Sequence, residues 1–345
     1  MEKINLKALT KKEIFELIRD LKLPDFRARQ ILHWIYQKYA QSITEITEFS
    51  IELRERLDRI AFISNLKILQ RKVSSDATEK FLFGLFDNEV VESVVIPDDE
   101  RQTLCISSQV GCSMGCIFCA TGRLGLKRNL KSHEIFDQPI SVSRAIAPEK
   151  LTNYVFMGMG EPLLNFNNIV DVLWRMVELM KISPRRITLS TAGIVPKIYE
   201  LREKAPPINL AISLNAPNNR TRDLIMPVNK MYPLKELIEA CRRFPMPPRK
   251  RITFEYIMLK DINDSPHDAA KLLSLLKGIP SKVNLIPFNP FNGCELQGSD
   301  YKTILRFQEI LLKGNMTAII RKSKGGDIGA ACGQLRASIK NDHDI

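Results

Sequence analysis

CSMGCIFC, residues 112–119, spaces three cysteines as C-x3-C-x2-C, in a loop that follows the strand-like stretch TLCISS (103–108). Three thiolates on one short loop can bind three corners of a cube-shaped iron–sulfur cluster, which normally takes four cysteines. This loop supplies only three, so one iron would stay open to another ligand. Cys112, Cys116 and Cys119 are therefore predicted to hold such a cluster.

Two other interpretations of these cysteines compete with a cluster. A structural zinc ion would require four protein ligands, and the histidines show no close pairing that would complete the set: His33, His133, His267 and His343. Three buried structural cysteines would need no partner. The chain has seven cysteines, an odd number, and four of them lie between residues 105 and 119. That pattern argues against a disulfide framework and for metal or redox chemistry.

Strand-like and helical stretches alternate beyond residue 100. The expected strands are TLCISS (103–108), NYVFMG (153–158), ITLSTA (187–192), INLAISL (208–214), ITFEYIML (252–259), KVNLIPF (282–288) and TAIIRK (317–322). Helical segments such as NIVDVLWRMVELM lie between them. This alternation predicts parallel βα units. About six units predict an α/β fold with a partial (βα)6 barrel rather than the full eight.

The chain before residue 100 has a different organisation. Thr10 and Glu13 have the T-x-x-E form of a capping box, and Asp25 can cap a second helix. LKILQRKV, KFLFGLF and VVESVVIP then follow with turns between them, as is typical of a short antiparallel meander. We therefore expect a small N-terminal helical accessory domain (1–62), a β-meander linker (63–98), a barrel core (99–338) and a tail (339–345).

Charge and hydropathy restrict the classes of partner. The chain carries 51 Lys and Arg against 39 Asp and Glu, a net charge of +12, with basic clusters at 127–131, 185–186, 249–251 and 321–324. Such an excess favours a polyanion, most often nucleic acid, and a lysine-rich soluble surface would give the same count. The apolar runs fall far short of the roughly 20 residues that span a bilayer. The N-terminus has no apolar signal region, so we expect a cytoplasmic protein without a membrane partner.

Polar and glycine residues stand at the carboxyl ends of the expected strands. GMGEP (158–162) ends the second strand, and Glu161 offers a carboxylate to an amino group. Further polar ends are Ser190, Ser213-Leu214-Asn215 and Asn289. Each one alone could be an ordinary turn residue. In a parallel barrel, however, all of them meet at one end, beside the cysteine-bearing loop.

The longer motifs carry a family resemblance. They are TLCISSQVGCSMGCIFCATG, FMGMGEPLLN, RRITLSTAGIVP, LAISLNAP, VNLIPFNPF and RKSKGGDIGAACGQL. Together they resemble the RlmN/Cfr family of radical S-adenosylmethionine enzymes, which methylate an adenine of 23S ribosomal RNA. The resemblance extends from the N-terminal helical region to about residue 338.

The resemblance implies cofactors and site residues. It implies one [4Fe-4S] cluster on Cys112, Cys116 and Cys119, and two S-adenosylmethionine molecules for each turnover. It implies contacts to S-adenosylmethionine from Gly160, Glu161, Ser190, Ser213, Leu214, Asn215 and Asn289. It assigns chemistry to Cys105, Cys332 and Glu92. It also implies 23S rRNA as a partner, an electron donor for the cluster and a reductant for a disulfide. Whether a tRNA is a second substrate stays open.

The family mechanism would explain why a methyltransferase carries an iron–sulfur cluster. A ring carbon such as adenine C2 is electrophilic, so ordinary transfer from a sulfonium fails there, whereas a carbon radical can add. By resemblance, Cys332 takes a methyl group, and its methylene radical adds to the base. Glu92 is the candidate proton acceptor. Cys105 then attacks the sulfur of Cys332, which releases methylated RNA and leaves a disulfide to be reduced.

Without the family, these residues have plainer interpretations. Cys105 would be a small buried strand residue, and Glu92 would lie on the solvent face of an alternating strand. Cys332 would be a lone thiol among glycines, which we expect to give its loop freedom to move. The RKSK cluster (321–324) precedes that loop, and phosphate binding there would deliver a base to the thiol.

Two residues need separate mention, and two other functions compete with this one. Asn215 stands where many family members have histidine, so a side-chain contact there would be made by an amide. Pro139 falls within the helix expected after the cluster loop, which should bend or restart there. The sister activity, methylation at C8 of the same adenine, shares these motifs. A non-catalytic, zinc-stabilised RNA-binding module is the alternative from another class.

Overall fold

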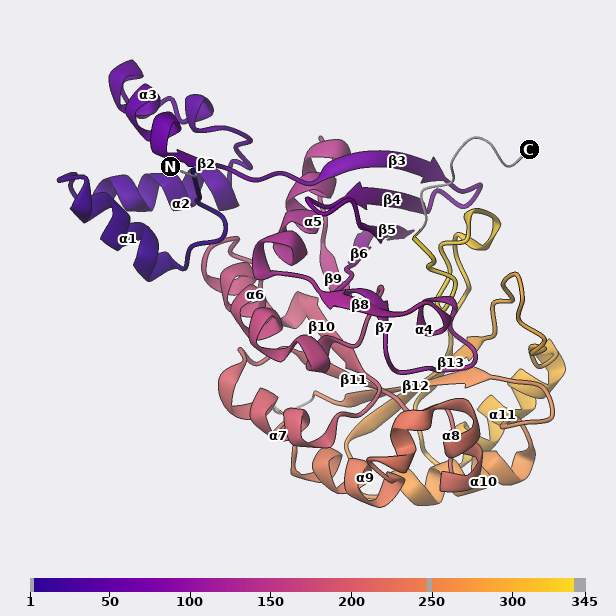
Figure 1. Ribbon diagram of the computed structural model, residues 1–345. Coiled ribbons are helices and arrows are strands. Elements are labelled where there is room, and N and C mark those ends of the chain that lie inside the picture. Colours follow the sequence, from indigo (N-terminus) through magenta and orange to yellow (C-terminus); the bar gives the residue numbers. More distant parts are fainter. Residues whose placement is uncertain (1–2, 247–249, 338–345) are drawn as a thin grey trace.

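The computed structural model describes residues 3–246 and 250–337. The expected tail (339–345) and Arg249, which belongs to one of the basic clusters, lie outside the described residues. Ten strands form one continuous sheet, and a separate group of short helices lies at the N-terminal end of the chain (Figure 1). In the described part of the chain, no helix is long and apolar enough to cross a membrane.

Seven parallel strands make up the barrel part of the sheet. They are β6 (Arg101–Cys105), β9 (Asn153–Phe156), β10 (Ile187–Thr191), β11 (Asn209–Ser213), β12 (Ile252–Met258), β13 (Ser281–Pro287) and β14 (Ala318–Ile320). Each pairs in parallel with the next in this order. The first six strands are those of the predicted (βα)6 unit, and β14 adds an edge strand. The predicted α/β partial barrel is confirmed.

Helices cover the outer side of the parallel strands (Figure 1). They are α5 (Ser132–Ala145), α6 (Phe166–Glu178), α7 (Val195–Lys204), α8 (Asn219–Ile225), α9 (Leu234–Arg243), α10 (Pro266–Leu276) and α11 (Tyr301–Lys313). Every residue of β12 is buried, as expected of a parallel strand with both faces covered. Because the parallel strands point the same way, their carboxyl ends meet on one side of the sheet.

The predicted meander extends the same sheet. β3 (Lys67–Val73), β4 (Glu79–Gly84) and β5 (Val90–Asp98) pair antiparallel, and β5 pairs antiparallel with β6. The strand order is therefore β14-β13-β12-β11-β10-β9-β6-β5-β4-β3. The meander is part of the barrel wall, and the sheet ends in two separate edges, β14 and β3.

A short hairpin carries the C-x3-C-x2-C stretch. β7 (Gln109–Cys112) pairs antiparallel with β8 (Gly125–Asn129), and α4 (Ala120–Arg123) lies between them. Cys112 is the last residue of β7, and Cys119 is the N-cap residue of α4. The expectation of a plain loop is wrong for β7 and β8. Neither stretch has the alternating apolar pattern that predicts a strand.

The N-terminal helices are α1 (Lys11–Asp20), α2 (Phe26–Tyr36) and α3 (Ile51–Ile60), held by the parallel pair β1 (Ile4–Asn5) and β2 (Ala61–Phe62). The capping box predicted at Thr10 and Glu13 is confirmed. The cap predicted for Asp25 is wrong in its chemistry. Asp25 occupies the N-cap position of α2, but its carboxylate makes no capping bond and accepts both contacts from Arg19, at 2.8 and 2.7 Å.

Buried polar contacts fasten these helices to the barrel. The ammonium of Lys7 donates to the carboxylate of Asp137 in α5, and both side chains are buried. Arg175 of α6 donates to the Lys7 carbonyl oxygen at 3.0 Å and to the Tyr36 hydroxyl at 2.9 Å. The Tyr36 ring lies 5.1 Å from that of Phe136. The N-terminal helices are therefore packed against α5 and α6.

The helix expected to bend or restart at Pro139 does not restart there, since α5 continues through this residue. A proline inside a helix removes one backbone N–H bond and costs about 3 kcal/mol when nothing compensates. Every residue from Glu134 to Val142 is buried. Packing on both sides of Pro139 therefore holds the helix together.

Candidate active site

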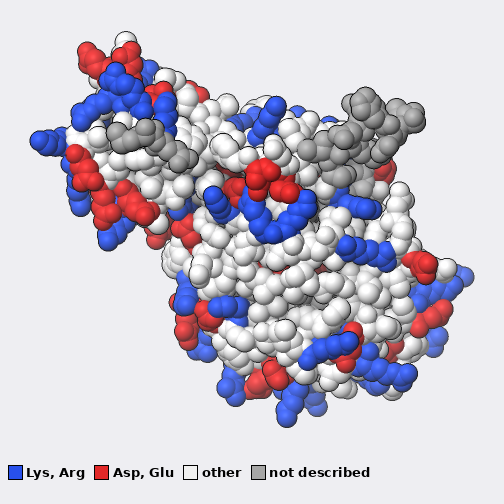
Figure 2. All heavy atoms as spheres, in the orientation of Figure 1, with Lys and Arg blue, Asp and Glu red and all other residues white. Residues whose placement is uncertain are grey.

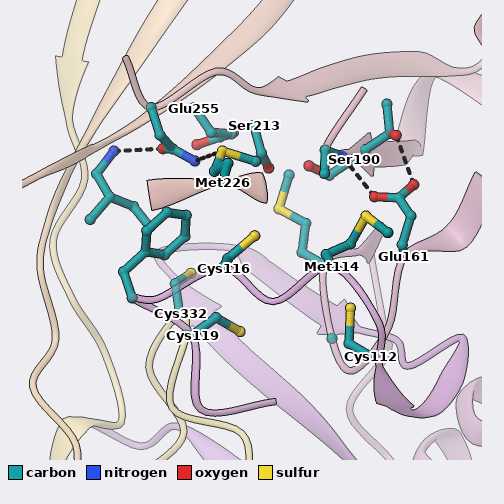
Figure 3. A pocket seen from close by; sticks show the side chains of 18 of the residues that line it. Cys112, Met114, Cys116, Cys119, Glu161, Ser190, Ser213, Met226, Glu255 and Cys332 are labelled. Carbon is teal, nitrogen blue, oxygen red and sulfur yellow. Dashed lines mark hydrogen bonds between the residues drawn. The ribbon is translucent and has the colours of Figure 1, made fainter. Parts of the chain in front are cut away.

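A pocket with about 830 Å³ of empty space, its open mouth included, lies at the carboxyl ends of the parallel strands. In Figure 3, four cysteines line one side of this pocket and a row of polar side chains lines the other: Cys112, Cys116, Cys119 and Cys332, against Glu161, Ser190, Ser213 and Glu255. The cysteines come from the hairpin and from the C-terminal segment. The polar side chains come from β10, β11, β12 and the loop after β9. The structure therefore brings together residues from the whole length of the barrel.

The three thiols of the C-x3-C-x2-C stretch are poised for a metal rather than for solvent. Burial raises the pKa of Cys112 to about 12, and burial also raises the pKa values of Cys116 and Cys119. A thiol in such surroundings keeps its proton unless a cation replaces it. Binding of iron would therefore release protons and give the buried thiolates their counter-charge.

A single zinc ion requires ligands that converge on one point. Four sulfurs around one zinc ion lie about 3.8 Å apart, given a Zn–S bond of about 2.3 Å. Among residues 3–246 and 250–337, no three His, Cys, Asp or Glu side chains are grouped closely enough to hold one metal ion. The three cysteines line one cavity. Three thiols on one cavity wall can each bind a separate corner of a [4Fe-4S] cluster, as the sequence predicts.

The carboxylate of Glu161 is tied into the pocket wall. One oxygen accepts from the Leu163 N–H at 3.0 Å and from the Thr191 hydroxyl at 2.7 Å, and the other accepts from the Ala192 N–H at 2.7 Å. Burial raises the pKa of Glu161, and these hydrogen bonds lower it. The residue joins the loop after β9 to the end of β10, while part of its acceptor capacity remains for a ligand.

Gly160 precedes Glu161 and must be glycine, because Gln109 of β7 approaches it closely. Gly160 has φ of 99°, and a Cβ there would lie 2.5 Å from the Cβ of Gln109. Any side chain would push the strand end away from β7, so the backbone can line the pocket only as glycine.

The other expected cofactor contacts fall into two groups. Ser190, Ser213 and Asn215 line the pocket, with Gly160 and Glu161. Leu214 and Asn289 do not line it. Leu214 is fully buried, and Asn289 donates to the Cys332 carbonyl oxygen at 3.2 Å. Asn289 thus contacts the catalytic candidate directly.

The departure at Asn215 has a structural explanation. Its side-chain oxygen accepts from the Ile257 N–H at 2.9 Å, and its amide nitrogen lies 3.3 Å from the Met226 sulfur. Its φ is 59°, in the left-handed region that asparagine tolerates well. The backbone is engaged as well, since the Asn215 carbonyl oxygen accepts from the Asn263 amide at 2.7 Å and its N–H donates to the Glu255 carbonyl oxygen at 3.3 Å. Protein partners therefore fix the position of Asn215 in the pocket wall.

Cys332 lies in the segment 325–337, here called the cysteine loop, and its side chain is exposed at the pocket. The expectation of a freely moving loop is not supported, since contacts hold it on both sides of Cys332. Gly325 N–H donates to Asp76, Lys80 donates to the Gly329 carbonyl, and the Ala120 N–H donates to the Gly333 carbonyl, at 2.8, 3.1 and 2.7 Å. The loop bridges the meander and the cluster hairpin.

Cys105 lies at the end of β6, next to the cysteine loop. Burial raises the pKa of its thiol to about 12; Cys332 raises it further, and Arg321 lowers it. The pKa of Arg321 is raised, and negative charge on Cys332 is the largest cause. Glu255 and Cys105 raise it as well, whereas burial lowers it. The two cysteines and the guanidinium therefore form one electrostatic unit.

The placement of Arg321 changes the interpretation of the RKSK cluster. Arg321 lines the pocket, and Lys324 donates to the Pro97 carbonyl and lies 3.7 Å from Asp98. Arg321 therefore serves the pocket and Lys324 the end of β5, and the expected phosphate-binding role does not suit these two cations. Similarly, Lys127 pairs with Glu89 and Arg128 with Asp87 and Glu134.

Glu92 is buried, which corrects its plain interpretation as a solvent-facing strand residue. One carboxylate oxygen lies 3.0 Å from the Lys80 ammonium, and the other accepts from the Arg336 N–H at 2.9 Å. Both partners contact or belong to the cysteine loop. Glu92 therefore lies against the segment that carries Cys332.

Sequence reasoning missed Glu255 and Arg321 in the pocket. Glu255 is buried; one oxygen accepts from the Asn284 amide at 3.0 Å, and the other has no hydrogen-bond partner among the described residues. A carboxylate within the otherwise apolar strand ITFEYIM was the available signal. A buried acceptor without a donor is unfavourable by about 1–3 kcal/mol, so Glu255 is suited to a ligand that donates.

The surface charge is unevenly distributed. On the face drawn in Figure 2, Lys and Arg lie among Asp and Glu over the N-terminal helices, and the middle of the face carries few charges. Arg185 and Arg186 are exposed, as the sequence pattern suggested. The net charge of +12 is therefore spread over several regions.

Comparisons with known proteins agree with this site. The model of the radical SAM superfamily matches residues 106–273, and that of the ribosomal RNA large subunit methyltransferase N-terminal domain matches residues 4–63. The chain is 48% identical to the dual-specificity RNA methyltransferase RlmN of Pelobacter propionicus, over 98% of this chain and 97% of that one. It is 47% identical to the protein of the same name from Geotalea uraniireducens, over 98% of each.

A solved structure agrees over the same length. The crystal structure of a radical SAM methyltransferase from Sphaerobacter thermophilus superposes with a TM-score of 0.92 at 39% identity, covering 97% of this chain and all of that one. The match includes both the N-terminal helices and the barrel. The chain therefore belongs to the RlmN family of radical SAM RNA methyltransferases.

Proposed function

We propose that this protein methylates C2 of an adenine in 23S rRNA and of an adenine in tRNA, through a methyl group carried on Cys332. The observation that carries this proposal is the meeting of Cys332 with the three cluster cysteines in one pocket, with Cys105 beside them. A methyl-carrying thiol must reach both a methyl donor and a substrate base. An exposed cysteine at the mouth of a pocket can do so.

The cofactors of this family are one [4Fe-4S] cluster and S-adenosylmethionine. In our proposal Cys112, Cys116 and Cys119 bind the cluster. Gly160, Glu161, Ser190, Ser213, Leu214, Asn215 and Asn289 surround S-adenosylmethionine, with Leu214 and Asn289 acting from behind the pocket wall. When bound, these cofactors supply a methyl group and the one-electron chemistry that a ring carbon such as C2 requires.

The residues of the chain then perform the steps in order. Cys332 accepts a methyl group as a thiolate, beside the positive charge of Arg321. After addition of the methylene carbon to the base, Glu92 takes the ring proton. Cys105, as a thiolate, attacks the sulfur of Cys332, and a disulfide forms as the carbon–sulfur bond breaks. The released carbon keeps the bonding electron pair and takes up a proton, which completes the methyl group on the base. Each turnover then requires a dithiol reductant, and the cluster requires a one-electron donor.

The RNA contacts of our proposal rest on the N-terminal helices (1–62). The exposed Arg185 and Arg186 precede β10 and lie at the opposite end of the strands from the pocket, so we assign them no contact. An enzyme that reacts with a base must take that base out of its stack, and a helical domain can grip structured RNA by its backbone. We propose 1–62 as an RNA-binding accessory domain, 63–98 as the support of the cysteine loop, and the rest to residue 338 as the catalytic core.

The test is mass mapping of the modified adenine in rRNA and tRNA from cells that lack their own enzyme and express this protein. We expect a methyl group at C2 in both RNAs. A methyl group at C8 would contradict the proposal. In parallel, anaerobic reconstitution should give a brown protein with four irons per chain; a colourless protein with stoichiometric zinc would overturn the proposed ligand set.

A further inference from the structure

We propose that Arg222 is the buried counter-charge of the iron–sulfur cluster and the positioning residue that holds two strand ends of the S-adenosylmethionine pocket. This inference rests on the cluster ligands proposed above. Arg222 lies in α8, outside every residue assigned so far, and its side chain is completely buried. Burial of a lone guanidinium is unfavourable unless other groups compensate its charge.

The hydrogen bonds of Arg222 show what it holds. Its Nη2 donates to the carbonyl oxygens of Ala192 at 2.6 Å and Ser213 at 3.2 Å, and its Nε donates to that of Leu214 at 3.0 Å. Ala192 and Ser213 line the pocket. One planar side chain therefore joins the ends of β10 and β11, next to the residues expected to contact S-adenosylmethionine.

The fourth bond explains why Arg222 keeps an uncompensated charge. Its Nη1 donates at 3.0 Å to the Asn229 amide oxygen, and the Asn229 amide nitrogen donates at 2.6 Å to Asp223. The Asp223 carboxylate is thus linked to Arg222 only through the Asn229 amide. In the described part of the chain, no carboxylate lies within 4 Å of the guanidinium. All four acceptors are neutral.

The loop that carries Cys116 packs against the C-terminal end of α8. The Ile117 N–H donates at 3.2 Å to the carbonyl oxygen of Ile225, the last residue of α8. A Cβ on Gly115 would lie 3.7 Å from Pro227, in the 3-10 turn η4 (Pro227–Lys230). Burial lowers the pKa of Arg222 to about 10, and Cys116 is the first charge that raises it. The geometry therefore places α8, which carries the buried guanidinium, against the loop that carries Cys116.

This placement has a redox consequence. Reduction adds one electron to a cluster already bound by three thiolates, and a fixed positive charge nearby makes that electron easier to accept. Removing the charge should make the cluster harder to reduce. A merely structural role would alter stability without altering the midpoint potential.

The experiment is a redox titration of the reconstituted cluster, followed by the electron paramagnetic resonance of its reduced form, in the full-length protein. R222Q should have a more negative midpoint potential than the wild type, whereas R222K keeps the charge and should stay near the wild-type value. Both variants lose the fork of contacts, so the Kd for S-adenosylmethionine should rise about tenfold in each, the equivalent of one lost hydrogen bond. The matched control is R175Q, which alters another buried arginine that lies among Lys7, Tyr36 and Asp171.

A second variant covers the case in which R222Q does not fold. D223N combined with N229D moves one carboxylate from residue 223 to residue 229, where it contacts Arg222. The net charge of the protein stays the same. The double variant should also lower the midpoint potential. Unchanged potentials in R222Q or in this double variant, or equal shifts in R222Q and R175Q, would overturn the inference. Wild-type protein that binds no cluster would instead contradict the proposed cluster site.

Discussion

The Glu92 carboxylate accepts a hydrogen bond from the backbone N–H of Arg336 at 2.9 Å, which joins β5 to the end of the cysteine loop. The other carboxylate oxygen lies 3.0 Å from Lys80, and Lys80 donates to the carbonyl of Gly329. Gly329 precedes Cys332 and Arg336 follows it. The candidate proton acceptor and the segment of the methyl carrier are therefore joined by contacts on both sides of Cys332.

We therefore expect E92Q to keep the loop in place but to lose the proton acceptor. Glutamine can still accept from the Arg336 N–H, so the loop should stay in place and Cys332 should still become methylated. Loss of a general base lowers rates by about 10²- to 10⁴-fold, so product formation should fall by that factor. Mass spectrometry of the protein and the RNA checks both. E89Q, at a surface pair with Lys127, should behave as wild type; full turnover by E92Q would exclude the role.

The position of Cys105 predicts a trapped intermediate. In C105A no thiol is available to attack Cys332, so RNA should remain covalently attached to the protein. A band that contains both protein and labelled RNA should appear on a denaturing gel, and peptide mapping should place the link at Cys332. C241A, which removes another buried thiol, should give no such band, nor should C105A combined with C332A. Normal turnover by C105A would refute the resolving role.

The raised pKa of Cys105 predicts how release depends on pH. Burial and the neighbouring Cys332 place this pKa at about 12, and the thiolate is the attacking form. Below that value the thiolate fraction rises about tenfold with each pH unit. In single-turnover experiments, the rate of RNA release should therefore increase about 100-fold between about pH 6.5 and pH 8.5. The RNA tolerates this range. A flat profile would mean that another group removes the proton.

Asp76 predicts how acid loosens the cysteine loop. Burial raises its pKa, but hydrogen bonds from Thr78, Gly325 and Ser74 outweigh that effect and lower it to about 2. Because the folded-state pKa lies below the usual value, the contribution is present above about pH 4 and is lost as the pH falls through about 2. D76N should likewise speed hydrogen exchange at the Gly325 N–H, with little change at the α11 amides. Equal exchange in D76N and wild type would contradict this tether.

The buried pair of Lys7 and Asp137 predicts a large stability change. K7M leaves the Asp137 carboxylate buried without its partner, which should reduce the free energy of unfolding by about 3–5 kcal/mol. Denaturant titration measures it. K3M, at the exposed pair of Lys3 and Asp58, should change stability by less than about 1 kcal/mol. K7M combined with D137L should recover most of the loss; no recovery would show that the pair acts through something other than its charges.

Local patterns were sufficient for much of the fold. The strands of the partial barrel follow from alternation and apolar runs, and the capping box of α1 follows from the T-x-x-E spacing. The C-x3-C-x2-C spacing alone predicts a three-cysteine cluster. The cap predicted for Asp25 and the restart predicted at Pro139 were wrong, because Arg19 and the packing around α5 override local preference.

The sequence by itself determined the parallel α/β core, the cluster stretch and the polar strand ends, because spacing and periodicity are short-range properties of the chain. Only the tertiary structure decided that Glu92 contacts Arg336, that Arg321 turns inward to Cys332, and that Arg222 joins Ala192 to Ser213. These partners are separated by up to 244 residues. No local pattern encodes such pairs, since they form only when packing closes the intervening chain.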